Sequence, residues 1–542
     1  VTPADATAPD FGTRYPLEVT FEPTASPYGA PNLLALTPVQ GMPLRAGERY
    51  AAVVTTAVSA ESGKPLEPAS KTALAQFADV DPSSLGVDSK DVAGMTVFTT
   101  GNPFASFAVA RTAALARALP VIDAPFVLTD TFADFCAYHT TIAMPDWQSG
   151  TPPYSSSGGT WVLDGSGAPV FDHTEEANLV LTVPRYPMGS GGYPLVVFVR
   201  TGGGGDRPLV DRGQQATNGG PAIEPGEGPA RYLARAGFAG IEVDGPLGGL
   251  RNTTQANEDF TTFNVANLGA MRDNIRESAL ELDVIAHVGV ALQVDVSDCP
   301  SSGGTATHFD ADHVVIMGHS MGSWIAPLAA AYEPLFKALV LSGAGGSWIE
   351  NIMWKQMPIA PLPVIETLLR DSPLAADDPV LTFAQWALEP ADPQVYGDLI
   401  VRETPDGAPP RHVLMIQGIV DHYILPRIAE ATSLSTGLDL AGPELDTEAV
   451  PDLAGQLALG PLLPLDGRSA LQLPVASNVT VSGAGVATAV VTQHMSDGIE
   501  DGHEVMFQTD PPKHEYQCML ASWLATGVPS VPTDASRDAP CP

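Results

Sequence analysis

One turn in the middle of the chain constrains the fold most. Residues 318–322 read Gly-His-Ser-Met-Gly and lie between an apolar run at 314–317 and an alanine-rich segment at 324–331. The run is typical of a buried strand and the segment of a helix. A strand that turns sharply into a helix raises its apical residue above the sheet, and glycines beside that residue let neighbouring backbone pass closely. The sequence therefore predicts a strained turn with Ser320 at its apex.

Strands and helices alternate on both sides of this turn. Apolar residues three or four positions apart predict a long helix over 268–285. Such alternation is typical of a mostly parallel sheet flanked by helices, so the predicted fold class is α/β. The other predicted elements are strands at 178–184, 195–199, 240–244, 338–341, 412–417 and 487–492, and a helix at 230–236.

The order of the polar residues after the turn fits nucleophilic catalysis. A serine hydroxyl is almost un-ionised at neutral pH, so it needs a base and a carboxylate that orients the base. In a sheet of this kind an acid and then a histidine follow the serine, each just after a strand. Asp421 follows the strand at 412–417, and His503 follows the last strand through a turn-rich segment. The predicted catalytic residues are Ser320, Asp421 and His503.

Three residues compete for these roles. His494 ends the last predicted strand and is the main alternative to His503. Asp497 and Asp501 are alternatives to Asp421, although both stand in a loop where aspartates commonly serve as turn residues. Placement directly after a strand favours Asp421 and His503.

Acyl transfer also requires backbone donors for the oxyanion. One is usually the amide after the nucleophile, here Met321, and another comes from the loop after an earlier strand. Residues 202–205 are four glycines that follow the strand at 195–199, and glycines leave backbone amides open to a ligand. Gly203 and then Gly204 are the predicted donors, with a flexible turn as the alternative. No Gly-Lys-Ser/Thr follows, which excludes a phosphate-binding loop.

With these motifs, residues 178–525 resemble the α/β-hydrolases and, more narrowly, the bacterial lipases called virulence-factor-like. The narrower resemblance rests on Arg-Asp-Asn-Ile-Arg at 272–276, on the turn at 318–322 and on Gln-Gly-Ile-Val-Asp at 417–421. It implies an α/β-hydrolase fold, serine esterase or lipase activity and an N-terminal β-sandwich. Thr201 departs from the family, in which a histidine often precedes the oxyanion glycine.

The remaining segments predict the domain organisation. Short β-prone runs between turn signals fill residues 15–100, which indicates a β-sandwich-like (Ig-like) region over residues 1–110 and a catalytic domain over residues 111–542. An apolar-rich segment at 347–409 interrupts the alternation. We expect it to form a helical cap that either lines an apolar substrate pocket or packs its apolar face on the body.

Composition restricts the partners. The net charge of −36, from 62 acidic and 26 basic residues, disfavours binding to nucleic acid and to anionic lipid. No apolar run reaches 18 residues, so no membrane span is expected. We expect neither a metal nor a cofactor.

The four cysteines lack metal-ligand spacing, which favours disulfides and a secreted or cell-surface location, extracellular or periplasmic. Three pairings are possible. Local separation favours Cys518 with Cys541 and Cys136 with Cys299.

The predicted activity is hydrolysis of carboxylic esters with an apolar acyl part, through an acyl-enzyme. A serine peptidase or amidase is an alternative because the same triad cleaves amides. A polyester depolymerase and a catalytically inactive surface-binding protein are the others. The sequence makes no prediction of acyl chain length or oligomeric state.

Overall fold

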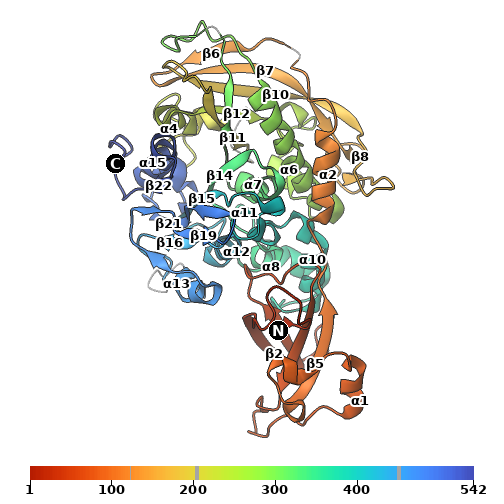
Figure 1. The fold of residues 1–542 in the computed structure, drawn as a ribbon. Coiled ribbons are helices and arrows are strands. Elements are labelled where there is room, and N and C mark those ends of the chain that lie inside the picture. The colour runs from red at the N-terminus through yellow and green to blue at the C-terminus, as the bar shows by residue number, and fades with distance from the viewer. Residues whose placement is uncertain (123, 202–206, 305, 448–452, 454) are drawn as a thin grey trace.

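The computed structural model describes residues 1–122, 124–201, 207–304, 306–447, 453 and 455–542. Its main feature is a mixed sheet to which eleven described strands contribute, in the spatial order β17-β16-β21-β15-β14-β13-β11-β12-β10-β7-β6 (Figure 1). Neighbouring strands are parallel from β17 to β12 and antiparallel from β12 to β6. In chain order the strands are β6 (Val127–Thr131), β7 (Phe135–Asp146), β10 (His173–Pro184), β11 (Tyr193–Val199), β12 (Ala239–Val243), β13 (Phe309–His319), β14 (Phe336–Ser342), β15 (His412–Ile419), β16 (Asp439–Ala441), β17 (Ala470–Leu471) and β21 (Ala489–Met495).

Helices cover both faces of this sheet (Figure 1). One face is covered by α2 (Ala105–Leu115), α6 (Leu268–Ala291), α7 (Met321–Tyr332), α11 (Asp398–Val401) and α12 (Pro426–Thr436). The other is covered by α3 (Pro208–Asp211), α4 (Pro229–Ala236), α14 (Val505–Gln508) and α15 (Asp510–Thr526). The predicted α/β class is thereby confirmed, with an α/β-hydrolase-like arrangement.

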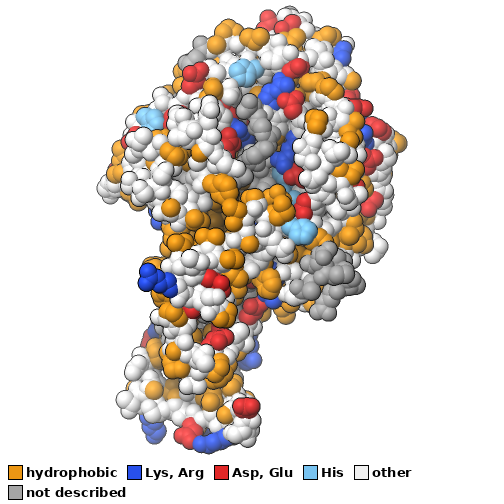
Figure 2. Space-filling view, turned by 180° about the vertical axis from the view of Figure 1, so that it is seen from behind, with side chains coloured by type: hydrophobic (Ala, Val, Ile, Leu, Met, Phe, Trp, Pro, Cys, Tyr) orange, Lys and Arg blue, Asp and Glu red, His pale blue; other side chains and the backbone are white. Residues whose placement is uncertain are grey.

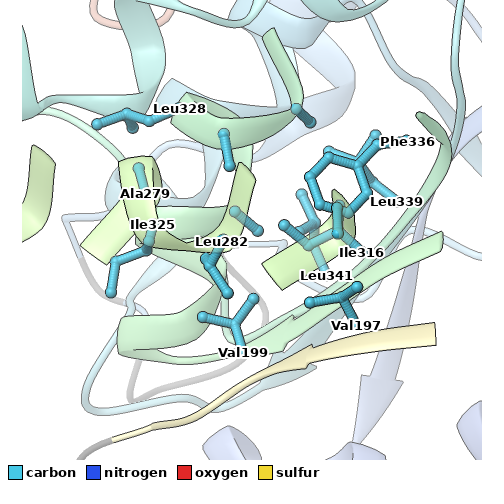
Figure 3. Close-up of a cluster of buried hydrophobic side chains, with 14 of the residues drawn as sticks. Val197, Val199, Ala279, Leu282, Ile316, Ile325, Leu328, Phe336, Leu339 and Leu341 are labelled. Atoms are coloured by element: carbon cyan, nitrogen blue, oxygen red, sulfur yellow. The ribbon is translucent and has the colours of Figure 1, made fainter. Parts of the chain in front are cut away.

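Side chains of the central strands point alternately into two cores, one on each face. In β11, Val197 and Val199 pack on the α6 face, whereas Val196 and Phe198 pack on the α4 face. Figure 3 shows the first of these cores, where side chains of the strands meet α6 and α7. Burial on both faces explains why the sequence shows these strands as uninterrupted apolar runs.

The N-terminal region contains two small antiparallel sheets. One is formed by β1 (Thr2–Pro3), β4 (Arg49–Thr55) and β5 (Val92–Thr99), and the other by β2 (Leu17–Glu22) and β3 (Leu33–Pro38). A short helix, α1 (Lys71–Leu74), lies between β4 and β5 in the chain. The expected β-rich region is thus present, and the boundary between 110 and 111 stays a prediction.

The segment at 347–409 is largely helical and has a small apolar core of its own. The Ser26 hydroxyl donates to the Asp378 carboxylate at 2.7 Å, and the Tyr28 hydroxyl donates to the Leu369 carbonyl at 3.0 Å. The N-terminal region is therefore hydrogen bonded directly to this cap. Besides α11, the cap contains α8 (Trp348–Trp354), α9 (Pro361–Leu369) and α10 (Pro379–Leu388).

Two disulfides join distant parts of the chain, Cys136 with Cys299 and Cys518 with Cys541, as expected from local separation. None of the described helices combines the length and the apolarity that crossing a bilayer requires. The remaining strands and α-helices of the described residues are short: β8 (Gln148–Ser149), β9 (Thr160–Trp161), α5 (Glu258–Thr262), α13 (Leu459–Leu462), β18 (Val475–Ala476), β19 (Val479–Val481), β20 (Gly485–Ala487) and β22 (Ser530–Val531).

Candidate active site

Ser320 occupies the turn between β13 and α7 in a strained conformation, with φ 54° and ψ −119°. A positive φ is unfavourable for a residue with a side chain, so the surroundings must hold it. A Cβ added at Gly318 would lie 2.6 Å from the carbonyl of Gly322, and a Cβ added at Gly322 would lie 2.6 Å from the carbonyl oxygen of Val199. Both flanking glycines are therefore required by backbone that passes at contact distance.

Hydrogen bonds to the neighbouring strand fix this turn. The Ser320 amide donates to the Ser342 carbonyl at 2.9 Å. The Ser323 hydroxyl donates to the carbonyls of Gly318 and Ser342 at 2.7 and 2.9 Å and accepts from the Ser342 amide at 3.0 Å. Ser323 thus ties the first turn of α7 to the ends of β13 and β14.

Asp421 and His503 form a buried pair. The Nδ1 of His503 lies 2.7 Å from Oδ2 of Asp421, and both side chains are 3% exposed or less. The other carboxylate oxygen, Oδ1, accepts the amides of Tyr423 and Ile424 at 2.8 and 2.7 Å. Three donors therefore orient the Asp421 carboxylate, and its contact with Nδ1 leaves Nε2 as the nitrogen that can exchange a proton elsewhere. In the described part of the protein, the buried Nε2 has no hydrogen-bond partner.

The His503 ring lies beside the Ser320 turn. Its centroid is 4.7 Å from that of His319, the residue before Ser320. A Cβ added at Gly343, which follows Ser342, would lie 2.7 Å from Cε1 of His503. The structure therefore brings the three predicted catalytic residues to one place at the carboxyl ends of β13, β15 and β21.

His319 is fully buried, and its ring lies next to that of His503. Burial, reinforced by the positive charge of Arg212, lowers the pKa of His319 to about 3, so its ring is neutral at physiological pH. Arg212 pairs with Glu504 at 2.6 Å. Burial alone would raise the pKa of Glu504, but Arg212 and His319 outweigh it and hold that pKa below the ordinary value. A negative charge therefore stands near the two imidazoles.

The competing residues have other partners. The Nε2 of His494 contacts Glu515 and Thr492, both at 3.1 Å. Asp501 contacts Nδ1 of His422 at 2.6 Å and accepts the backbone amide of His503 at 2.9 Å. Asp497 accepts the amide of Ile499 at 2.9 Å and the side-chain amide of Gln508 at 2.8 Å. Among the described residues, Asp421 is the one of these three aspartates whose carboxylate contacts the His503 side chain.

Of the three predicted oxyanion donors, Met321 lies in the described part of the chain. Met321 is the first residue of α7, and the first amides of a helix have no acceptor within it. Gly203 and Gly204 lie outside the described residues, and Thr201 before them is buried. A pocket opens beside Met321. Its apolar lining is Val199, Val243, Leu282 and Ile325, and its polar lining includes Arg200, Glu258, Ser278 and Glu281.

Two groups of histidine and carboxylate side chains in the described ranges have the donor types of a metal site, with ligand atoms within 4.8 Å of one another. They are Asp146, His173 and Glu175, and His494, Glu515 and Asp534. In the first group Arg251 pairs with Asp146 and Glu175 at 3.4 and 2.6 Å, so a guanidinium already balances the carboxylates. In the second, Glu515 is paired with His494 as described above.

One residue of the site was missed by sequence reasoning. The ring of Tyr423 stacks on His503 with a centroid distance of 4.5 Å and an interplanar angle of 15°. Its position two residues after Asp421 was the available signal, since a residue that close to the acid must lie near the base.

No protein-family model matches this chain, and no curated protein does. The solved structures that resemble it do so distantly. Acetyl xylan esterase 1 from Thermoanaerobacterium shares 14% identity over 61% of this chain and 83% of its own, with a TM-score of 0.36. A glucuronoyl esterase from Teredinibacter turnerae shares 15% identity over 76% of this chain and 79% of its own, with a TM-score of 0.35. The acylaminoacyl peptidase of Pyrococcus horikoshii shares 11% identity over 76% of this chain and 50% of its own, with a TM-score of 0.33. The chain therefore has a distant structural similarity to α/β-hydrolase esterases and peptidases, and the resemblance to one lipase family stays a prediction.

Proposed function

We propose that this protein is a serine hydrolase that cleaves carboxylic esters through Ser320, His503 and Asp421. The observation that carries the proposal is the buried 2.7 Å contact between Asp421 and His503, with the His503 ring packed beside the strained turn of Ser320. An acid, a base and a nucleophile arranged in this order are what acyl transfer by serine requires.

In the proposed reaction, Nε2 of His503 takes the proton of the Ser320 hydroxyl as the serine oxygen attacks the ester carbonyl. The Asp421 carboxylate stabilises the charged imidazolium and itself remains deprotonated. The amide of Met321 is one donor to the oxyanion, and Gly203 or Gly204 is the proposed second. The imidazolium returns the proton to the leaving alcohol, and a water activated in the same way then releases the acid from Ser320.

The substrate is proposed to carry an apolar acyl part. Aliphatic side chains line the pocket beside Met321. The cap also presents large apolar side chains to solvent, among them Leu368, Phe383 and Trp386. Figure 2 shows hydrophobic side chains on the part of the body that adjoins the narrower N-terminal region. Because the two disulfides persist in oxidising surroundings, we also propose an extracellular or periplasmic location.

The decisive test is the loss of Ser320. The purified protein is expected to hydrolyse p-nitrophenyl esters and to be labelled covalently by a fluorophosphonate, and Ser320→Ala is expected to abolish both. Hydrolysis retained by Ser320→Ala would refute the assignment. A parent protein that is neither labelled nor active would favour a surface-binding role.

A peptidase or amidase is the second candidate, because the same groups attack amides. A panel of ester and aminoacyl-anilide substrates, assayed side by side, separates the two. Rates across p-nitrophenyl esters from acetate to palmitate then measure the preferred acyl length.

A further inference from the structure

Four rings lie in a row through the site. Tyr423 stacks on His503 at 4.5 Å, His503 lies 4.7 Å from His319, and His319 lies 4.8 Å from Phe507. The contact of Tyr423 with His503 is nearly parallel, at 15°, whereas the His319 ring is tilted by 52°. Of these four rings, Tyr423 is the one whose face lies against the face of the His503 imidazole.

Tyr423 is itself held from two sides. Its amide donates to Asp421 Oδ1 at 2.8 Å, and its carbonyl accepts from Nζ of Lys355 at 2.9 Å. The amides of Gln356 and Met357, which follow Lys355 in the cap, both donate to the carbonyl of His422. The backbone that carries the Tyr423 ring is thus held both by Asp421 and by the cap.

We propose that Tyr423 is a positioning residue that holds the His503 imidazole and favours its charged form during turnover. The kinetic consequence of this inference rests on the proposed function, whereas the contact between the Tyr423 and His503 rings does not. The face of an aromatic ring carries negative potential and attracts a cation placed over it. When the proton of Ser320 moves to Nε2, the imidazole becomes that cation, and Tyr423 neither gains nor loses a proton.

Other charged groups also act on His503, and they are the same in every Tyr423 variant. Asp421 contacts Nδ1, and Glu504 and Arg212 lie on the His319 side. Lys355 lies 5.8 Å from the Tyr423 ring centroid, so its charge opposes that of the imidazolium. In the part of the chain that the structure describes, the titratable and charged groups near His503 include Asp421, Tyr423, His422, Asp501, Glu504, His319, Arg212 and Lys355.

Two substitutions at position 423 distinguish the effect of the aromatic ring from the effect of its hydroxyl group. Tyr423→Phe keeps the aromatic face, whereas Tyr423→Leu keeps an apolar side chain in the same place without it. For Tyr423→Leu the acidic limb of the pH profile of kcat/KM is expected to move down by about one pH unit. Its plateau kcat is expected to fall about tenfold. For Tyr423→Phe the acidic limb is expected to stay where it is in the parent. A residue that only fills space would lower the rate without moving the limb.

The closing experiment does not depend on turnover. In a Ser320→Ala background, the ring signals of His503, assigned by their loss in His503→Gln, are titrated by NMR with Tyr, Phe or Leu at position 423. The expected result is a midpoint that falls with Leu alone. A midpoint that is the same with Leu as with Tyr would overturn the proposal, as would an equal fall with Phe. A fall with Leu, together with a parent protein containing Ser320 that hydrolyses no ester, would keep the ring assignment and refute the proposed function.

Discussion

The backbone of Gly418 packs directly on the backbone of Gly502, with no room for a side-chain atom between them. A Cβ added at Gly418 would overlap the carbonyl of Gly502, and a Cβ added at Gly502 would overlap the carbonyl of Val420. The Gly502 amide also donates to the Val420 carbonyl at 2.9 Å. The loop that carries Asp421 and the loop that carries His503 therefore pack together, backbone on backbone, where they leave the sheet. This packing sets the distance between the two side chains.

This packing makes Gly502→Ala a sensitive substitution. The added methyl must push the two loops apart, so we expect kcat/KM to fall about a hundredfold and the free energy of unfolding to fall by about 2 kcal/mol. Ester kinetics and urea unfolding measure the two effects. The matched control is Gly189→Ala, since nothing lies within 4 Å of a Cβ at Gly189. Wild-type kinetics for Gly502→Ala would contradict the role of the packing.

The two aspartates of the site are expected to differ sharply. Asp421→Asn leaves Nδ1 of His503 without its carboxylate, and we expect kcat to fall roughly 10³- to 10⁴-fold. Asp501→Asn keeps an acceptor for the His503 amide and weakens only the contact with His422, so a loss of about tenfold or less is expected. Steady-state hydrolysis of one ester by both variants measures the difference. The reverse ranking would reassign the catalytic acid to Asp501.

Stability is expected to decrease as the pH rises through neutrality. Burial raises the pKa of Glu242 to about 8, although the Leu209 amide that donates to it acts in the opposite direction. The unfolded chain releases this proton near the ordinary value of 4.5. The contribution of Glu242 to the free energy of unfolding is therefore complete below pH 4.5 and is lost as the pH rises towards 8, on the order of 5 kcal/mol in all. Burial also raises the pKa of Glu281 and of Glu350 to about 7, with the same sign.

Urea unfolding at about pH 5 and about pH 8 tests this for the parent and for Glu242→Gln. The parent is expected to lose more stability between the two values than the variant, which has no proton to release at this position. Equal losses would show that Glu242 is not the group responsible.

The two disulfides are expected to contribute unequally. The bond between Cys136 and Cys299 closes a sequence separation of 163 residues, and that between Cys518 and Cys541 closes 23. Chain entropy then predicts losses of about 5 and about 3 kcal/mol when each pair is replaced by alanine. Unfolding of the two double variants without reductant gives the comparison. A larger loss for the C-terminal pair would contradict it.

The sequence predicted those parts of the fold that local pattern determines. The apolar run at 195–199 became β11, and Ser320, Asp421 and His503 lie near one edge of the sheet because the parallel strands that precede them end there. The long helix was also predicted correctly, but its surroundings were not. Leu268, placed on the apolar stripe, is 46% exposed, whereas Asp273 and Glu277 on the same helix are fully buried.

Those exceptions depend on contacts between distant segments. Glu277 accepts the backbone amide of Trp147 at 2.9 Å, and Asp273 accepts the backbone amide of Trp161 at 3.1 Å. A carboxylate can be buried where hydrogen-bond donors from elsewhere in the chain reach it. The spacing of residues within the helix does not indicate such donors. The stacking of Tyr423 on a histidine 80 positions later is hidden from local pattern for the same reason.

The two rings at the ends of the row of four rings lie in different hydrophobic cores. Phe507 belongs to the core on the α4 face of the sheet, and Tyr423 packs against the core on the α6 face. His503 and His319 therefore connect, through ring contacts, the two hydrophobic cores that lie on opposite faces of the sheet. A packing defect in either core is therefore expected to be transmitted to His503 through these rings, even where the defect lies far from Ser320.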